Sequence, residues 1–218
     1  MTIETGVFRR LTETKLIAVV TIDQVDQARR VCEALLDGGV HAMELTLRTP
    51  NALKSLRIVA SEFPDMIVGA GTLVTPEQID QVVDAGAQFG VSPGLNGAVL
   101  EAARERDLPF APGIMTPSEL DAALIHHRCR FMKFFPAESS GGLKHLESIV
   151  TPYAHLEPRF IPLGGVNRSN LEHYLRCRWV AAIGGSWIAA RSLIENGDWN
   201  QIRTNAAAAR ELVNSIRA

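Results

Sequence analysis

The sequence predicts a closed α/β barrel of the (β/α)8 TIM type with an N-terminal capping helix. Short apolar segments alternate with longer segments of helical period, which is typical of repeated βα units around a parallel sheet. Eight such units follow one another, and no linker or change in composition divides them. An open doubly wound sheet is the alternative, but its G-x-G-x-x-G motif is missing after the first strand. We therefore expect one barrel domain over residues 1–218, with a helix around residues 4–13 closing its lower end.

Each predicted strand is a short apolar run, as expected for strands that are buried on both faces of a parallel sheet. In chain order the expected strands cover residues 16–20, 42–47, 67–72, 89–94, 109–114, 131–136, 159–165 and 180–186.

The predicted helices have recognisable starts and ends. A threonine can cap the free N–H groups of a first turn, while a proline after it occupies the first helical position without losing a hydrogen bond. Helices are expected after Asp23 and after the Thr-Pro pairs at 49–50, 75–76 and 116–117. Glycines at 38, 39 and 86 suit a left-handed helix end.

Composition limits the kinds of partner. The formal net charge is -2, and no block of Lys and Arg could neutralise a row of phosphates, so we expect no nucleic acid as the main partner. No apolar run approaches the ~20 residues that span a bilayer, and the N-terminus carries no apolar signal segment, so no membrane partner is expected. The three cysteines are far apart and fit a reducing compartment. We expect a cytoplasmic protein.

Polar side chains gather at the C-terminal ends of the predicted strands, where barrels of this type carry their chemistry. Side chains alternate along a strand, so Glu44 shares a face with Ala42 and Thr46, and Lys133 shares a face with Phe131. The opposite faces are wholly apolar and suit packing against the outer helices. Glu44 and Lys133 are therefore expected to point into the barrel.

A buried Lys–Glu pair has two interpretations. It is either a structural ion pair or an acid/base pair with a catalytic role. Burial among Phe and Met disfavours the charged form of a lysine and makes a neutral, nucleophilic amine more accessible, which favours catalysis. Lys133 would then attack a carbonyl to form a Schiff base, and Glu44 would transfer protons. The planar fork of Arg48 suits a substrate carboxylate, although alone it would be interpreted as a solvated arginine.

Two diglycines end the last two predicted strands, Gly164-Gly165 and Gly184-Gly185, and Ser186 follows the second. The loops after these strands frequently form a phosphate site in barrels, because glycine lets backbone N–H groups approach an anion. A single diglycine would be merely a turn, but two on adjacent strands favour a phosphate site. None of the six histidines lies in a predicted strand, and His41 is expected at the opposite end of the barrel. We expect neither a metal nor a cofactor.

The ordered motifs GGVHAMELTLRTP, IVGAGT, VSPG, FMKFFPAE, PLGGV and IGGSW resemble those of the 2-keto-3-deoxy-6-phosphogluconate (KDPG) aldolases, a family that includes enzymes also cleaving 4-hydroxy-2-oxoglutarate. The resemblance covers nearly the whole chain. It implies a homotrimeric class I aldolase, a lyase of carbohydrate metabolism that acts on a small phosphorylated keto acid. In the Entner-Doudoroff pathway such an enzyme splits KDPG into pyruvate and glyceraldehyde 3-phosphate, and the second substrate would give pyruvate and glyoxylate.

The resemblance also implies roles for individual residues. Lys133 would be the Schiff-base lysine and Glu44 the general acid/base. The pyruvate moiety would be bound by Arg48, Thr72 and Pro93, and the phosphate by Gly164, Gly165, Gly185 and Ser186. The family commonly has Thr before the first diglycine, where this chain has Leu163, which cannot hydrogen-bond the C4 hydroxyl of the substrate.

Three alternatives stay open at this point. The first is a 2-keto-3-deoxy-6-phosphogalactonate aldolase, because related galactonate-type enzymes also carry an apolar residue at the position of Leu163. The second is a phosphosugar isomerase or epimerase in which Glu44 acts as base and no imine forms. The third is a catalytically silent sugar-phosphate-binding protein, which would have no need of Glu44, Arg48 and Lys133 together.

Overall fold

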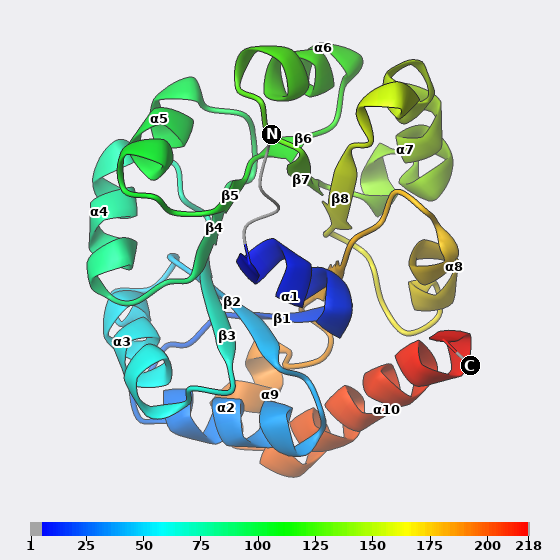
Figure 1. Ribbon diagram of the computed structural model, residues 1–218. Helices are drawn as coiled ribbons and strands as arrows, with labels where there is room; N and C mark the ends of the chain where they lie inside the picture. The colour runs from blue at the N-terminus through cyan, green and yellow to red at the C-terminus, as the bar shows by residue number, and fades with distance from the viewer. Residues whose placement is uncertain (1–5, 218) are drawn as a thin grey trace.

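Parallel strands form a closed barrel inside a ring of helices (Figure 1). The computed structural model describes residues 6–217. Its strands are β1 (Leu16–Val20), β2 (Ala42–Thr46), β3 (Ile67–Gly71), β4 (Phe89–Val91), β5 (Phe110–Ala111), β6 (Gly113–Ile114), β7 (Phe131–Phe134), β8 (Arg159–Pro162) and β9 (Ile183–Gly185).

The barrel closes at two places where regular pairing is interrupted. The strand order is β5-β4-β3-β2-β1-β9 in one sheet and β6-β7-β8 in the other. β5 and β6 are two halves of one strand that breaks at Pro112, which has no N–H, although its carbonyl accepts a 2.8 Å hydrogen bond from the Lys133 N–H. β8 joins the stretch before β9 through a bridge between Phe160 and Val180. The described segments therefore make the eight-stranded barrel that the sequence predicts.

Several predicted strands end earlier than expected. β4 ends at Val91, β7 at Phe134 and β8 at Pro162, although the sequence predicted strands to 94, 136 and 165. The extra residues leave the sheet because they include Pro93 and Pro136, which cannot donate to a ladder, and two glycines with positive φ. These residues form loops at the C-terminal rim of the barrel instead.

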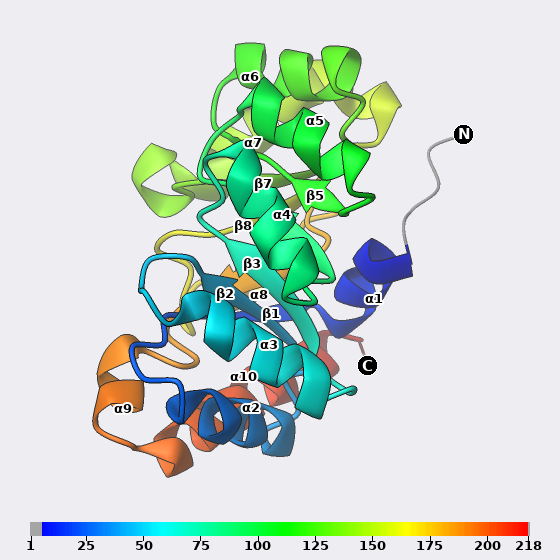
Figure 2. The same cartoon turned by 90° about the vertical axis from the view of Figure 1, so that its left-hand side faces the viewer.

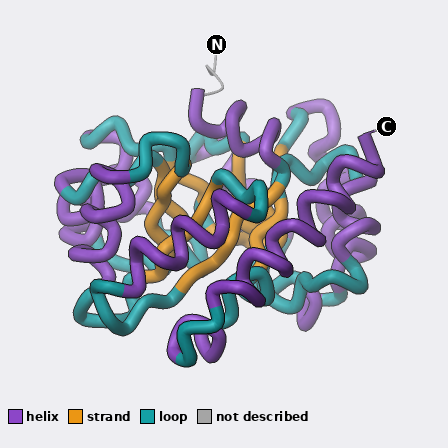
Figure 3. Tube along the Cα trace, turned by 90° about the horizontal axis from the view of Figure 1, so that it is seen from below, coloured by secondary structure: helices purple, strands orange, loops and turns teal. Residues whose placement is uncertain are grey.

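Helices surround the barrel, and Figure 3 shows them in front of the strands and on either side of them. The helices are α1 (Gly6–Thr14), α2 (Gln27–Asp37), α3 (Ala52–Glu62), α4 (Pro76–Asp84), α5 (Gly97–Glu105), α6 (Pro117–Asp121), α7 (Gly142–Val150), α8 (Leu171–Arg176), α9 (Arg191–Glu195) and α10 (Trp199–Arg217). Shorter helical turns are η1 (Ala122–His126), η2 (Glu138–Ser140) and η3 (Thr151–Leu156). Gly38 lets α10 pack closely on the end of α2, because a Cβ there would lie 2.4 Å from Cβ of Ala206.

Two of the four predicted helix starts are confirmed. α4 begins at Pro76 and α6 at Pro117, each after the expected threonine. At α6 the Thr116 hydroxyl accepts from the Glu119 N–H at 3.3 Å, and the Glu119 carboxylate accepts from the Thr116 N–H at 2.9 Å. This reciprocal pair is a capping box, which satisfies two N–H groups of the first turn.

The other two predicted starts are wrong because their polar side chains connect loops. α2 begins at Gln27, since the carboxylate of Asp23 binds Arg191 at 2.8 Å and does not cap the helix. α3 begins after Asn51, and the hydroxyl of Thr49 donates at 2.5 Å to a main-chain carbonyl in the loop after β1. The Thr49 bond joins the loop after β2 to the loop after β1, and the Asp23 bond joins the loop after β1 to the start of α9 (Arg191–Glu195).

The side chains separate into an inner and an outer apolar layer. Met43 and Met132 pack between the strands and the helices, whereas Phe131 lies inside the barrel. Helix α1 lies across one end of the barrel (Figure 2), and its Phe8 ring stacks on Phe131 with centroids 4.5 Å apart. The predicted alternation and capping helix are thus confirmed, while residues 4 and 5 of the expected helix lie outside the described residues. The apolar filling of the lower half leaves the polar residues at the upper end.

Candidate active site

A pocket of about 240 Å³ opens at the C-terminal ends of the strands. It brings together nine of the ten residues that the sequence singles out; Gly185 is buried in β9 and does not line it. The lining residues are Val19, Glu44, Arg48, Thr72, Pro93, Lys133, Phe135, Leu163, Gly164, Gly165, Val166, Gly184 and Ser186. Residues that are up to 167 positions apart in the sequence therefore surround one small space.

Lys133 and Glu44 face each other inside the barrel. The Lys133 Nζ lies 3.4 Å from Glu44 Oε1, and their side chains are only 7% and 3% exposed. Lys133 projects from the middle of β7 and Glu44 from the middle of β2, so rigid strands hold both. The Lys133 Nζ also lies 4.9 Å from the centroid of the Phe135 ring, at a distance suited to a cation–π contact.

The contact with Glu44 is the one ion pair that Lys133 makes among the described residues. Within residues 6–217, Glu44 is the single carboxylate in salt-bridge range of Lys133. Lys133 lines the pocket, and the Phe135 ring lies on one side of its amine. A lysine held in this way can present its amine to a carbonyl that enters the pocket.

The loop after β3 holds an unusual backbone conformation beside this pair. Thr72 has a φ of 64°, a left-handed value that is strained for a β-branched residue. Such strain gathers at functional sites, where surrounding contacts maintain it. Across the rim, no described carboxylate lies within salt-bridge range of the exposed Arg48, so its guanidinium can accept an anionic ligand.

The first diglycine forms a second, polar side of the pocket. Gly164 and Gly165 have φ values of 91° and 86°, which only glycine adopts without strain. The Gly165 carbonyl accepts hydrogen bonds from the side-chain amides of Asn167 at 3.0 Å and Asn170 at 3.3 Å. Ser186 lines the pocket nearby. Backbone N–H groups beside a hydroxyl, with the loop fixed by amides, suit a phosphate group.

An apolar wall lies between the lysine and the diglycine loop. Leu163 is 4% exposed and lies over Gly184, where a Cβ would come within 2.5 Å of the Leu163 Cγ. Val19 and Val166 extend this wall. These two valines were not predicted as site residues, although the alternation of side chains in β1 places Val19 on the inner face.

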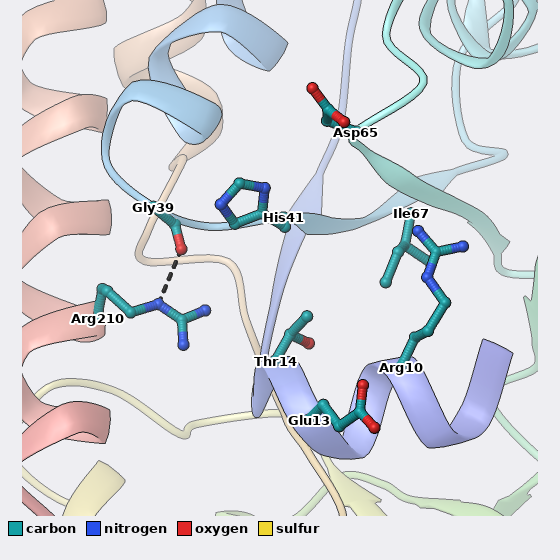
Figure 4. Close-up of a pocket in the computed structure, with 8 residues that line it drawn as sticks. All are labelled: Arg10, Glu13, Thr14, Gly39, His41, Asp65, Ile67 and Arg210. Atoms are coloured by element: carbon teal, nitrogen blue, oxygen red, sulfur yellow. Dashed lines mark hydrogen bonds between the residues drawn. The ribbon is translucent and has the colours of Figure 1, made fainter. Parts of the chain in front are cut away.

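Two other cavities lie at the opposite end of the barrel and a third lies between α2 and α10, and none of the described residues that line them is a lysine. One of about 460 Å³ beside α1 is lined by Arg10, Glu13, Thr14, Gly39, His41, Asp65, Ile67 and Arg210 (Figure 4). It is larger than the pocket at the rim, but it has no lysine and lies away from the strand ends that carry chemistry. The position of His41 there agrees with the expectation from the sequence.

Among residues 6–217 no three His, Cys, Asp or Glu side chains come together as metal ligands. In the same part of the chain, no helix has the length and apolar character needed to cross a membrane.

The closed barrel and its Lys–Glu pocket define the class of the protein, an enzyme of the class I aldolase type. A family model described as KDPG and KHG aldolase matches residues 7–205, and the chain belongs to this family. The chain is 43% identical to the 2-dehydro-3-deoxy-phosphogluconate aldolase of Dickeya dadantii, with 93% of this chain and 92% of the relative covered. It is 42% identical to the KHG/KDPG aldolase of Escherichia coli, with 88% and 89% covered.

A solved structure supports the same assignment. The KDPG aldolase of Legionella pneumophila superposes with a TM-score of 0.88 at 38% identity, covering 94% of this chain and 98% of that one. In that crystal structure pyruvate is captured at low pH as a covalent carbinolamine intermediate.

Proposed function

We propose that this chain cleaves KDPG to pyruvate and glyceraldehyde 3-phosphate through an imine on Lys133. The observation that carries this proposal is the buried Lys133–Glu44 contact of 3.4 Å at the floor of a pocket with a cationic side and a diglycine side. The carbinolamine in the Legionella pneumophila relative supports a covalent route of this kind.

The first half of the reaction builds the imine. The neutral amine of Lys133 attacks the C2 carbonyl, and the carbonyl oxygen gains a proton to give a carbinolamine. Loss of water then leaves a protonated imine. Glu44, which faces the Lys133 Nζ, is placed to supply the proton that the departing water needs. The low exposure of both groups limits competition from bulk water.

The second half breaks the bond between C3 and C4. A base removes the proton of the C4 hydroxyl, the C3–C4 electron pair moves into the protonated imine, and glyceraldehyde 3-phosphate leaves. The remaining enamine takes a proton at C3, and water releases pyruvate and restores the amine. We assign the proton transfers to Glu44, because no other carboxylate lines the pocket in the described part of the chain.

The ends of the substrate fit the two sides of the pocket. Arg48 and Thr72 would bind the carboxylate beside the carbonyl, with Pro93 as a neighbouring wall. Gly164, Gly165 and Ser186 would bind the phosphate at the other end. Gly184 lines the pocket, whereas Gly185 does not. Gly185 would contribute to phosphate binding indirectly, through the backbone conformation of β9.

The side chain of Leu163 would influence which substrate is preferred. Its buried apolar side chain offers no hydrogen bond to a C4 hydroxyl, so the site would discriminate weakly between the gluconate and galactonate epimers. We propose that 4-hydroxy-2-oxoglutarate (KHG) is a second substrate, and that the galactonate epimer is the strongest competing assignment. A coupled assay that offers all three compounds side by side would rank them by kcat/KM.

A trapping experiment tests the covalent step. Incubation with pyruvate and borohydride should add one reduced pyruvyl group, and peptide mapping should find it at Lys133 and at none of the other three lysines. Lys133→Met should abolish the adduct, while Lys144→Met, at an exposed position in α7, should leave it complete. EDTA should leave cleavage intact. A wild-type protein without an adduct would contradict the imine mechanism and favour the isomerase alternative.

The resemblance to the family supports a proposal for the assembly, and the composition supports one for the location. We propose that each chain folds as a single barrel domain and that three chains form a homotrimer in the cytoplasm. Both stay predictions, and sedimentation of the purified protein would test the trimer.

A further inference from the structure

A buried tyrosine outside the pocket connects two of the segments that follow pocket strands. Tyr174 of α8 is 2% exposed, and its hydroxyl donates a short hydrogen bond to Oε1 of Glu138. Glu138 belongs to the segment that follows the Lys133 strand, whereas α8 follows the diglycine loop. Neither residue lines the pocket, so neither has a part in the chemistry described above.

Glu138 lies directly against the diglycine. Its backbone N–H donates to the Gly164 carbonyl at 3.0 Å, and the preceding N–H of Ala137 donates to the Leu163 carbonyl at 2.7 Å. A Cβ on Gly165 would lie only 2.6 Å from the Cβ of Glu138. A displacement of Glu138 would therefore displace the two glycines as well.

The hydrogen bond to Tyr174 fixes where the carboxylate of Glu138 points. Glu138 is exposed as a residue, so without a partner its side chain would be free to adopt other rotamers. Oε1 lies beside Gly142, where a Cβ would come within 3.1 Å, and therefore outside the pocket lining. This orientation also keeps a negative charge turned away from a site for an anion.

The tyrosine is suited to a permanent donor role. Burial raises the pKa of Tyr174 well above its ordinary value, and the bond to Glu138 raises it further. The phenol therefore keeps its proton throughout the pH range in which an enzyme of this kind would be assayed.

We propose that Tyr174 and Glu138 are positioning residues for the phosphate of the substrate. Their hydrogen bond holds Glu138 against Gly164-Gly165 and so keeps the diglycine loop in the conformation that receives the phosphate. The inference rests on the phosphate site assigned under the proposed function. It requires that loss of the hydrogen bond weakens the binding of phosphorylated ligands and leaves the binding of ligands without a phosphate unchanged.

Tyr174→Phe tests the inference because it removes one oxygen and keeps the ring. The KM for KDPG should rise about 10- to 100-fold, the range expected when one hydrogen bond to a charged group is lost. The inhibition constant of inorganic phosphate should rise with it. The kcat/KM for KHG and the yield of the pyruvate–borohydride adduct should stay unchanged, because neither compound carries a phosphate.

The chain offers a matched control in its only other tyrosine. The Tyr153 hydroxyl donates to Asp121 at 3.5 Å, and neither residue lines the pocket. Tyr153→Phe should leave the KM values for KDPG and KHG unchanged. If Tyr174→Phe does not fold, Glu138→Ala at its exposed position should give the same split between substrates. The double variant should be no worse than either single one, as expected for a pair that acts together.

The outcomes separate this inference from the function on which it rests. A wild-type protein that forms no adduct and cleaves no KDPG would overturn the proposed function. The positioning role alone would be overturned if the wild-type protein does both but Tyr174→Phe weakens the binding of phosphorylated and unphosphorylated ligands equally. It would also be overturned if Tyr174→Phe changes the binding of neither.

Discussion

The carboxylate of Glu44 lies against the backbone of Gly71. A Cβ at Gly71 would come within 1.8 Å of Glu44 Oε1 and within 2.5 Å of its carboxyl carbon. Gly71 ends β3, and its neighbour in β2 is Thr46, so the two strands are in direct register at this point. The absence of a side chain on β3 thus makes the space that Glu44 occupies beside Lys133.

Gly71→Ala should displace Glu44 and separate it from Lys133. We expect kcat/KM for KDPG to fall at least about a hundredfold, the usual size of a general acid–base contribution. Gly94→Ala is a matched control at the same rim, because a Cβ there meets no atom within 4 Å. Steady-state assays of both variants check this. Equal activity of the two would show that the Glu44 position is not critical.

Glu44→Gln should separate proton transfer from binding. The amide oxygen can still accept a hydrogen bond from Lys133, so the fold and the pocket should persist. The kcat for KDPG should fall by about 100- to 10,000-fold while its KM changes little. Glu101→Gln, on the exposed Arg104 pair of α5, serves as the control. A variant that keeps more than half of the wild-type kcat would remove Glu44 from the mechanism.

Much of the barrel follows from local patterns. The eight apolar runs and their alternation predicted the strand cores, because burial on both faces leaves a strong sequence signal. The helix starts after Asp23 and Thr49 could not be predicted, because these side chains bind partners far along the chain, such as Arg191. The ends of β4, β7 and β8 were also predicted too late, since their last residues leave the sheet for the rim.

The pocket residues could be predicted where the alternation of side chains along a strand fixes which way each side chain points. Lys133 and Glu44 follow from alternation within β7 and β2. The left-handed conformation of Thr72 and the packing of Glu138 on Gly165 could not be predicted, because both depend on contacts between loops. The resemblance of the motifs, and not their spacing, supplied the substrate and the roles of Thr72 and Pro93.

Cys32 should make the fold sensitive to alkaline pH. Burial in α2 raises the pKa of this thiol from an ordinary value of 9.0 to about 12. Below pH 9 the thiol is protonated in the folded and unfolded states, so it has no effect on the pH dependence. As the pH rises from 9 towards 12, only the unfolded chain ionises, and stability is lost. Cys32→Ala should therefore show a shallower fall of Tm across this window than the wild type.

The control for this prediction is a cysteine with a smaller shift. Cys129→Ala should reduce the fall of Tm with pH less than Cys32→Ala does, because burial raises the pKa of Cys129 only to about 11. Thermal melts at intervals between pH 8 and 12 check both variants, and the expected differences in Tm are about a few degrees. Identical pH slopes for wild type and Cys32→Ala would contradict the expectation.

Leu163→Thr should make the pocket discriminate more strongly between the two epimers. The side chain lies over Gly184 between the lysine and the diglycine loop, so a hydroxyl at this position would face the middle of the substrate. We expect the ratio of kcat/KM for KDPG over its galactonate epimer to change by about tenfold, because a paired hydroxyl is lost in one epimer. Loss of buried apolar volume should also lower stability by about 2 kcal/mol. Leu163→Val, which removes volume without adding a hydroxyl, is the control. If the valine variant changes the epimer ratio as much as the threonine variant does, pocket shape and not hydrogen bonding sets the preference.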